Sequence, residues 1–211
     1  MSSISNLLTR CRTAINNALN DAGLAAKLAA YGYDTTEINA GKALYEAALS
    51  LDDLQNHNHA SEKQVYTDYK KRRNQLRLTY MKHLKVARIA FRDNQQAFSE
   101  LLLAGKRDPK FDIFEKQYHS FYSGLTTNAD YQTSFNRYIP QADVTAAAAE
   151  FNAVLTLHEN YLIAIAETQN ATEERNQAID RLEKWYADFT IIAKVAFSDS
   201  PQQLEKLGIK A

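Results

Sequence analysis

Two long stretches of this chain contain neither glycine nor proline, and this feature limits its fold more than any other. The stretches run over residues 42–104 and 141–200, and the whole chain of 211 residues has only six glycines and three prolines. Glycine and proline mark turns, and a chain without them that is rich in alanine, leucine, glutamate and lysine favours long helices. The sequence therefore predicts an all-α protein, an elongated helical bundle with long coiled-coil-like helices.

The chain also contains an internal repeat. Residues 87–93, ARIAFRD, recur 106 residues later as AKVAFSD over residues 193–199. Nearer the N-terminus the offset becomes 107, since Tyr31 pairs with Tyr138, so one residue was gained near Pro140. Self-similarity over this length is typical of a duplicated supersecondary unit. We interpret the chain as a tandem duplication of about 105 residues.

The duplication predicts the domain organisation. Residues 1–108 form one helical unit and residues 109–211 a second, here called repeat 1 and repeat 2, and we expect them to pack together as one structural domain. Each repeat is expected to consist of two short helices and one long helix. In repeat 1, Gly32 ends the second short helix and Asp34 can cap the long one, with Glu37 placed to complete a capping box.

Each long segment is apolar at its ends and polar at its centre, and this pattern leaves two structures open. The segment is either one rod of about 55 to 65 residues or a helical hairpin that turns at the polar centre, which lies at residues 56–71 in repeat 1 and 167–177 in repeat 2. The unbroken heptad phase of repeat 2 and the missing turn residues favour the rod. The mean length of a globular helix, about 11 to 12 residues, favours the hairpin.

The duplicated motif near the end of each long segment carries a stripe of small and aromatic residues. Small alanines on one face permit close approach of another helix, so the motif predicts a packing site, and one of its aspartates can cap a following short helix. A docking site for a partner helix is the alternative. The residues concerned are Ala87, Ala90, Phe91 and Asp93, with their counterparts Ala193, Ala196, Phe197 and Asp199.

Behind the second copy of the motif the chain continues as LEKLGI over residues 204–209. Together with the preceding helix, which is rich in tyrosine and alanine, this pattern resembles a group of uncharacterised bacterial all-helical proteins with a duplicated long-helix unit. The resemblance implies the fold, and it implies no activity, cofactor or ligand.

The charges of the two repeats differ in sign. The chain has 25 basic and 25 acidic residues, and residues 1–105 carry a net charge of +4 whereas residues 106–211 carry −4. Opposite charge favours association of the repeats, although exposed ion pairs contribute only about 0 to 1 kcal/mol each. We therefore expect the two long helices to pack side by side mainly by burying apolar residues, namely Leu76, Tyr80, Leu182 and Tyr186.

A basic cluster in the first long segment is the strongest candidate for a binding site. Four of its side chains fall near one helical face with tyrosines close by, a combination that can hold phosphates and stack bases. The corresponding segment of repeat 2 carries acidic residues and the net charge is zero, which favours a solvated or inter-repeat face and argues against nucleic acid. The candidate anion-binding residues are Lys70, Arg73, Arg77 and Arg88.

The sequence lacks the motifs of enzymes, cofactor sites and metal sites. It has no glycine-rich phosphate loop, dinucleotide fingerprint or nucleophile elbow. Asp53, His57 and His59 lie close in sequence, but imidazoles two residues apart do not share a helix face. We therefore expect no enzymatic activity, no cofactor and no bound metal.

The single cysteine and the hydropathy pattern favour a cytoplasmic location. Cys11 excludes an intrachain disulfide and is interpreted as a small buried hydrophobe. The longest apolar-rich stretch, residues 186–197, is interrupted by Asp188 and Lys194, and the N-terminus does not read as a signal peptide. We expect no transmembrane segment.

These observations lead to one main functional hypothesis and two alternatives. The main hypothesis is a non-enzymatic helical interaction or scaffold protein that binds another protein or associates with itself. The first alternative is binding of nucleic acid or an anionic surface through the face from Lys70 to Arg88. The second is a membrane-active helical protein that exposes its alanine-rich segments.

Overall fold

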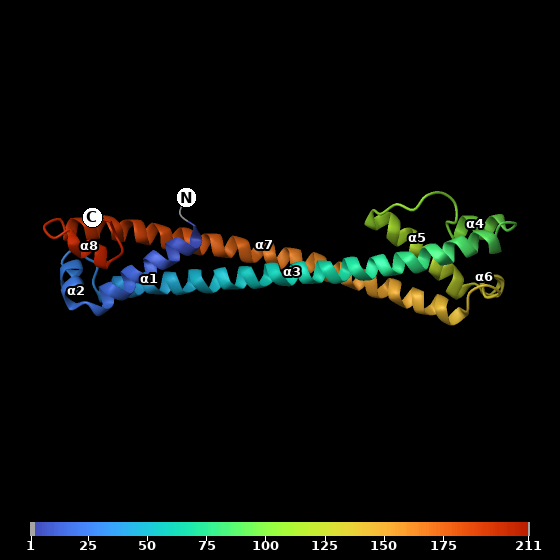
Figure 1. Ribbon diagram of the computed structural model, residues 1–211, viewed down its shortest axis with the longest axis horizontal. Helices are drawn as coiled ribbons and strands as arrows, with labels where there is room; N and C mark the ends of the chain where they lie inside the picture. Colours follow the sequence, from blue (N-terminus) through green and yellow to red (C-terminus); the bar gives the residue numbers. More distant parts are fainter. Residues whose placement is uncertain (1–2, 211) are drawn as a thin grey trace. The chain divides into compact units, whose positions relative to one another are not determined.

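A computed structural model describes residues 3–210, and within this range the chain is helical with no strand (Figure 1). The all-α prediction is confirmed. Each repeat contributes four helices in the same order. They are α1 (Ile4–Asn20), α2 (Ala22–Ala29), α3 (Thr35–Ala90) and α4 (Gln95–Glu100) in repeat 1, and α5 (Phe111–Thr127), α6 (Ala129–Phe135), α7 (Gln141–Ala196) and α8 (Gln202–Lys206) in repeat 2.

The helices of the two repeats match in order, and the first and third helices of each repeat also match in length. α1 and α5 both have 17 residues, and α3 and α7 both have 56. Thr35 and Gln141, at which the long helices begin, are separated by the repeat offset of 106. The agreement supports the duplication. Each long segment is one continuous helix, so the rod is correct and the hairpin is wrong.

Side-chain caps define where the first helices begin. The Ser3 hydroxyl accepts a hydrogen bond from the Asn6 amide, and the Asp34 carboxylate accepts hydrogen bonds from the amides of Thr36 and Glu37 at 2.9 and 3.0 Å. Gly32, with φ of 88°, provides the left-handed residue after α2. Ser3 and Asp34 therefore cap the helices predicted from the sequence.

The predicted capping box and both predicted aspartate caps are wrong. The Glu37 carboxylate accepts a hydrogen bond from the indole of Trp185 at 3.3 Å, so it takes part in packing between helices. Asn94 caps α4 by accepting from the Ala97 amide at 3.0 Å, a role that the sequence assigned to Asp93. Asp199 likewise caps no helix, and its carboxylate forms an ion pair with Lys27. Side chains one or two residues apart compete for these roles, and sequence distance alone does not separate them.

The chain divides into two compact units that cut across the repeats. Unit 1 comprises Met1–Ala60 and Ala166–Ala211, and unit 2 comprises Ser61–Ile165. Each unit therefore contains two short helices and the first half of the long helix from one repeat. The other repeat supplies the second half of its long helix and its last short helix. The two repeats, residues 1–108 and 109–211, are therefore units of the sequence, whereas each compact unit of the structure is built from parts of both repeats.

Within each unit the two long helices lie side by side and antiparallel. In unit 1, Glu37 meets Trp185, and Gln55 accepts a hydrogen bond from Arg175 at 3.0 Å, so rising numbers in α3 meet falling numbers in α7. In unit 2 the Arg72 guanidinium donates two hydrogen bonds to the Glu150 carboxylate, at 2.8 and 2.6 Å. The predicted packing of α3 beside α7 is confirmed.

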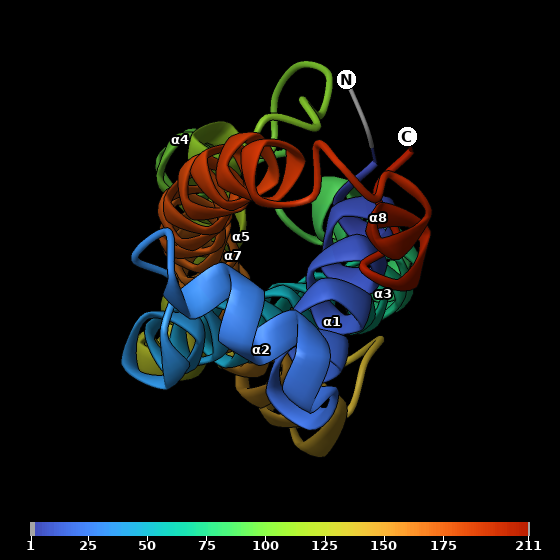
Figure 2. The same cartoon turned by 90° about the vertical axis from the view of Figure 1, so that its left-hand side faces the viewer.

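The first short helix of each repeat packs against the long helix of the other repeat. In unit 1 the Arg10 guanidinium of α1 lies 5.1 Å from the centroid of the Tyr186 ring, and Figure 2 shows α1, α2 and α8 grouped around the ends of the long helices of this unit. In unit 2 the Tyr118 ring of α5 stacks on Tyr80 at 3.8 Å. Tyr80 and Tyr186 are repeat partners, so both units contain the same contact between the first short helix of one repeat and the long helix of the other.

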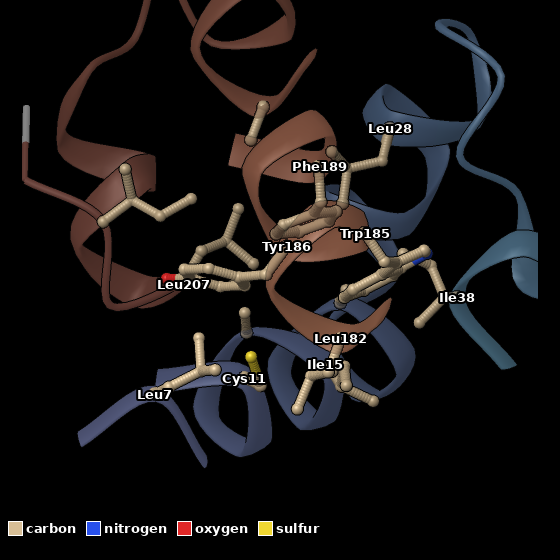
Figure 3. Packing of buried hydrophobic residues seen from close by; sticks show 14 of the residues in the cluster. Leu7, Cys11, Ile15, Leu28, Ile38, Leu182, Trp185, Tyr186, Phe189 and Leu207 are labelled. Carbon is tan, nitrogen blue, oxygen red and sulfur yellow. The ribbon is translucent and has the colours of Figure 1, made fainter. Parts of the chain in front are cut away.

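Each unit has its own apolar core, made from both repeats. In unit 1, side chains from α1 and α7 turn toward a common interior, where Ile15 lies against Leu182 and Cys11 lies near Tyr186 (Figure 3). Burial raises the pKa of the Cys11 thiol to about 12, so the thiol stays protonated. Phe91 and Phe197, the aromatic residues of the duplicated motif, are both buried.

Gly41 of α3 is an expected point of sensitivity in unit 1. A methyl group at this position would overlap the Trp185 ring, which Phe189 and the hydrogen bond to Glu37 hold in place. Replacing a helical glycine by alanine ordinarily stabilises by about 0.5 to 1 kcal/mol. Gly41→Ala is expected to destabilise instead, by about 1 to 3 kcal/mol through overpacking, as measured by urea denaturation. In a Trp185→Leu background the same substitution should become neutral or stabilising. Stabilisation of the parent protein by Gly41→Ala would contradict this packing.

Candidate anion-binding site

A cavity of about 480 Å³ lies in unit 2, between α3, the linker after α4 and the start of α5. Its volume falls within the range of about 300 to 1,000 Å³ that is usual for small-molecule sites. Its cationic lining residues are Lys70, Arg73, Arg77 and Arg107, and its aromatic ones are Tyr66, Tyr69, Phe114 and Tyr118. We call this space the basic cavity.

Helical spacing explains why α3 presents these side chains together. Lys70, Arg73 and Arg77 follow one another at intervals of three and four residues, which place side chains on one helical face. Tyr66 and Tyr69 continue the same face by one turn toward the N-terminus. The predicted clustering of these three cations with tyrosines is therefore found at the wall of the basic cavity.

Arg73 is held in place by its surroundings. Its guanidinium donates a hydrogen bond to the Tyr69 hydroxyl at 3.1 Å and another to the Pro109 carbonyl, and it lies 4.5 Å from the centroid of the Phe114 ring. A guanidinium has five N–H donors, so three remain for other partners. Arg73 is thus a cation fixed in position with spare donors.

Arg107 comes from the linker and is half-buried in the cavity wall. One of its terminal nitrogens donates to the Leu102 carbonyl at 2.6 Å, and its guanidinium lies 5.7 Å from the centroid of the Tyr80 ring. Burial is the main cause that lowers the pKa of Arg107, because a desolvated cation is less stable than a hydrated one. An anion in the cavity would offset this cost.

The four cations of the basic cavity have no acidic partner. Throughout residues 3–210, no carboxylate oxygen lies within ion-pairing distance of Lys70, Arg73, Arg77 or Arg107. Asp108 also lines the cavity, and its carboxylate accepts a hydrogen bond from the Lys110 amide at 2.8 Å. Like charges gathered around one space repel each other, so this arrangement favours an anionic occupant.

The aromatic side chains make the rest of the wall apolar but leave it hydroxyl donors. Phe114 and Tyr118 of α5 are buried and contact each other at 4.1 Å between ring centroids. Burial raises the pKa values of the Tyr69 and Tyr118 hydroxyls, which therefore remain neutral at physiological pH. The wall can thus receive an apolar part of a ligand without adding negative charge.

Arg88, the fourth candidate from the sequence, does not line the basic cavity. Its guanidinium donates hydrogen bonds to the carbonyls of Leu103 and Gly105, both at 2.8 Å. It therefore fastens the linker to the end of α3. The grouping by helical face was wrong for this residue because the linker folds back over its part of the face.

Sequence reasoning missed the lining residues that lie outside α3. Arg107 belongs to the segment that joins the two repeats, and Phe114 and Tyr118 belong to α5, the first short helix of repeat 2. The usable signal was weak. Arg107 lies in a short charged segment between Lys106 and Asp108, and nothing local shows which helix such a linker crosses.

Unit 1 has no equivalent of the basic cavity lining. At the repeat offsets, Lys70, Arg73 and Arg77 correspond to Asn176, Ile179 and Glu183. On the short helix, Phe114 and Tyr118 correspond to Leu7 and Cys11. The shared fold therefore does not require these charges, because unit 1 forms its core without them.

The other sequence candidates do not gather into a site. In residues 3–210 no group of three or more histidine, cysteine, aspartate or glutamate side chains is placed to hold a metal ion. The eight residues of the duplicated motif serve as core and helix-end positions, with Ala87 and Ala193 fully buried.

Comparison of the chain with family models, curated proteins and solved structures finds no match.

Proposed function

We propose that this protein is a non-enzymatic binding protein whose basic cavity holds a ligand with a multiply charged anionic group, such as a phosphate. One observation carries the proposal: four cations that form no ion pair within residues 3–210 converge on one small space, where Asp108 is the only acidic lining residue. An anionic ligand would relieve their mutual repulsion and use the spare donors of Arg73. Since unit 1 folds without these charges, stability alone does not account for them.

The other functions expected from the sequence have less support. Leu162 in unit 2 and Ile191 in unit 1 are exposed apolar side chains of the kind that a protein partner could cover. Single exposed apolar residues are normal on protein surfaces, however, so they do not by themselves indicate a partner. Of the helices in residues 3–210, none combines the length and apolar character needed to cross a bilayer. The interaction and membrane-active roles remain predictions.

The proposal is tested by charge reversal at an exposed residue of the basic cavity. Arg77 is exposed and forms no ion pair, so Arg77→Glu should leave the melting temperature nearly unchanged. A hydrogen bond to a charged group contributes about 1.5 to 3 kcal/mol, so the variant should bind inorganic tripolyphosphate about tenfold or more weakly. Isothermal titration calorimetry measures both dissociation constants.

Lys71→Glu is the matched control. Lys71 lies on the same helix and is also exposed, but it does not line the basic cavity. Its replacement by glutamate changes the net charge by the same amount as Arg77→Glu. It should weaken binding by less than about threefold, because exposed charges outside the site act only through screened long-range attraction. Equal effects of the two reversals, or no binding of tripolyphosphate by the parent protein, would refute the proposal.

A further inference from the structure

The lining of the basic cavity changes in character along α3. Tyr66 and Tyr69 lie at one end and Arg77 at the other, and at about 1.5 Å per residue the eleven-residue step from Tyr66 to Arg77 spans roughly 16 Å. Arg73 lies between them and Arg107 reaches in from the linker. A small inorganic anion would contact only the cationic part of such a site.

Tyr66 is the one aromatic lining residue with an exposed ring. Its side chain is 41% exposed, whereas Tyr69, Phe114 and Tyr118 are buried. Tyr161 supports the ring of Tyr66 at 5.0 Å between centroids, and the Lys70 ammonium lies 5.8 Å from the ring centroid. A ring that is supported by a neighbour and still open to solvent can stack with a flat group of a ligand.

The cationic part is rich in arginine, which favours phosphate over a single carboxylate. Guanidinium groups bind phosphate oxygens through paired hydrogen bonds, and three of the four cations are arginines. Arg73 is already fixed against Phe114, so it loses little freedom when it binds a ligand. The two parts together match a ligand with a flat ring at one end and phosphate at the other.

We propose that the ligand is a nucleotide, with its base against Tyr66 and its phosphates among Arg73, Arg77 and Arg107. This inference rests on the proposed anion-binding function and adds the class of ligand. The nucleotide can be free or part of a single strand, because both present the same base and phosphate chemistry. The cavity volume of about 480 Å³ suits one nucleotide rather than a duplex.

The test compares ligands that share one part of a nucleotide. Isothermal titration calorimetry on the full chain measures adenosine triphosphate, inorganic tripolyphosphate and adenosine. Base stacking on an aromatic side chain should make the nucleotide bind roughly 5- to 150-fold more tightly than tripolyphosphate. Adenosine should bind weakly, because it lacks the charge that the arginines recognise.

Variants of Tyr66 separate stacking from charge. Tyr66→Leu should bring the affinity for adenosine triphosphate close to that for tripolyphosphate, leaving tripolyphosphate binding within about twofold, whereas Tyr66→Phe should keep the difference. Tyr138→Leu is the control, because Tyr138 is an exposed tyrosine of the same unit, 55% accessible, outside the cavity lining.

The outcomes distinguish this inference from the function on which it rests. Equal affinity for nucleotide and tripolyphosphate, unchanged by Tyr66→Leu, would overturn the nucleotide assignment and leave anion binding intact. Absence of binding by both would overturn both proposals. If the nucleotide assignment holds, the affinity for an oligothymidylate of about ten residues is compared with that for thymidine monophosphate. Binding of the oligonucleotide that is more than tenfold tighter identifies a single strand as the source, and similar affinities identify the free nucleotide.

Discussion

Cutting the chain between the repeats before it folds is expected to leave neither half folded as a monomer. Fragments 1–108 and 109–211 separate residues that share one core, such as Ile15 and Leu182 in unit 1 and Tyr80 and Tyr118 in unit 2. Each fragment alone would expose the apolar faces that the other covers. Domains are marginally stable, by about 5 to 15 kcal/mol, so loss of half of each core removes the folded monomer.

The fragments are expected to recover the fold when they meet. Equimolar mixing should restore a cooperative thermal transition by circular dichroism and a one-to-one complex by light scattering after gel filtration. Each fragment alone should melt without cooperativity or associate with itself, since a second copy can offer the missing faces through the equivalent repeat positions.

A cut made after folding is the matched control. A protease site placed in the linker at the exposed residues Gly105 and Lys106 should allow cleavage of the folded chain, and the two pieces should stay together because both cores remain intact. If either fragment alone is a monomer that melts cooperatively near the melting temperature of the full chain, then the repeats are independent domains. The packing of each first short helix on the long helix of the other repeat would then be wrong.

Leu182→Asp is expected to be among the most damaging single substitutions in this protein. The side chain is fully buried and lies beside Ile15 and Trp185 in the core of unit 1 (Figure 3). Loss of a buried leucine costs about 2 to 5 kcal/mol, and a carboxylate in its place adds the cost of burying an unpaired charge. The total should reach about 5 kcal/mol or more, comparable with the whole stability of a domain.

Thermal melting measures this effect. At about 2 to 4 °C per kcal/mol for a chain of this size, Leu182→Asp should lower the melting temperature by at least about 10 °C or prevent folding. Lys184→Asp adds the same side chain two residues away at an exposed position, and it should change the melting temperature by less than about 3 °C. A Leu182→Asp variant that melts like the parent would contradict the position of this residue in the core.

The same experiment refines one expectation about surface charge. Sequence alone predicts that reversing Arg72 hardly matters, but the structure places its guanidinium in a two-point contact with Glu150. Both side chains are about one-third to one-half exposed, so solvent and salt screen the pair and its loss should have only a small effect on stability. The effect therefore stays far below that of Leu182→Asp.

Local patterns in the sequence determined the helices of this protein and most of their ends. The absence of glycine and proline from residues 42–104 and 141–200 predicts the two long helices, and the Asp34 carboxylate marks the start of the first one. Apolar spacing also identified Phe91 and Phe197 as buried. These features depend on interactions within one or two helical turns, which the order of residues specifies directly.

Part of the basic cavity could also be predicted from the sequence. Lys70, Arg73 and Arg77 share a helical face whatever packs against it, so their clustering follows from their spacing. Arg107 and Tyr118 enter the cavity only because the linker and α5 cross this stretch of α3, and Arg88 leaves it because the linker carbonyls bind its guanidinium.

Only the tertiary structure decided which apolar faces meet. The two repeats carry similar stripes, with Tyr80 equivalent to Tyr186, and each first short helix lies against both long helices of its unit, as where Tyr118 of α5 contacts Tyr80 of α3 and Phe151 of α7. Hydrophobic burial is non-directional and does not by itself specify these contacts. They depend on complementary shape, as where Trp185 lies over Gly41, and such fits between distant residues have no local signature in the chain.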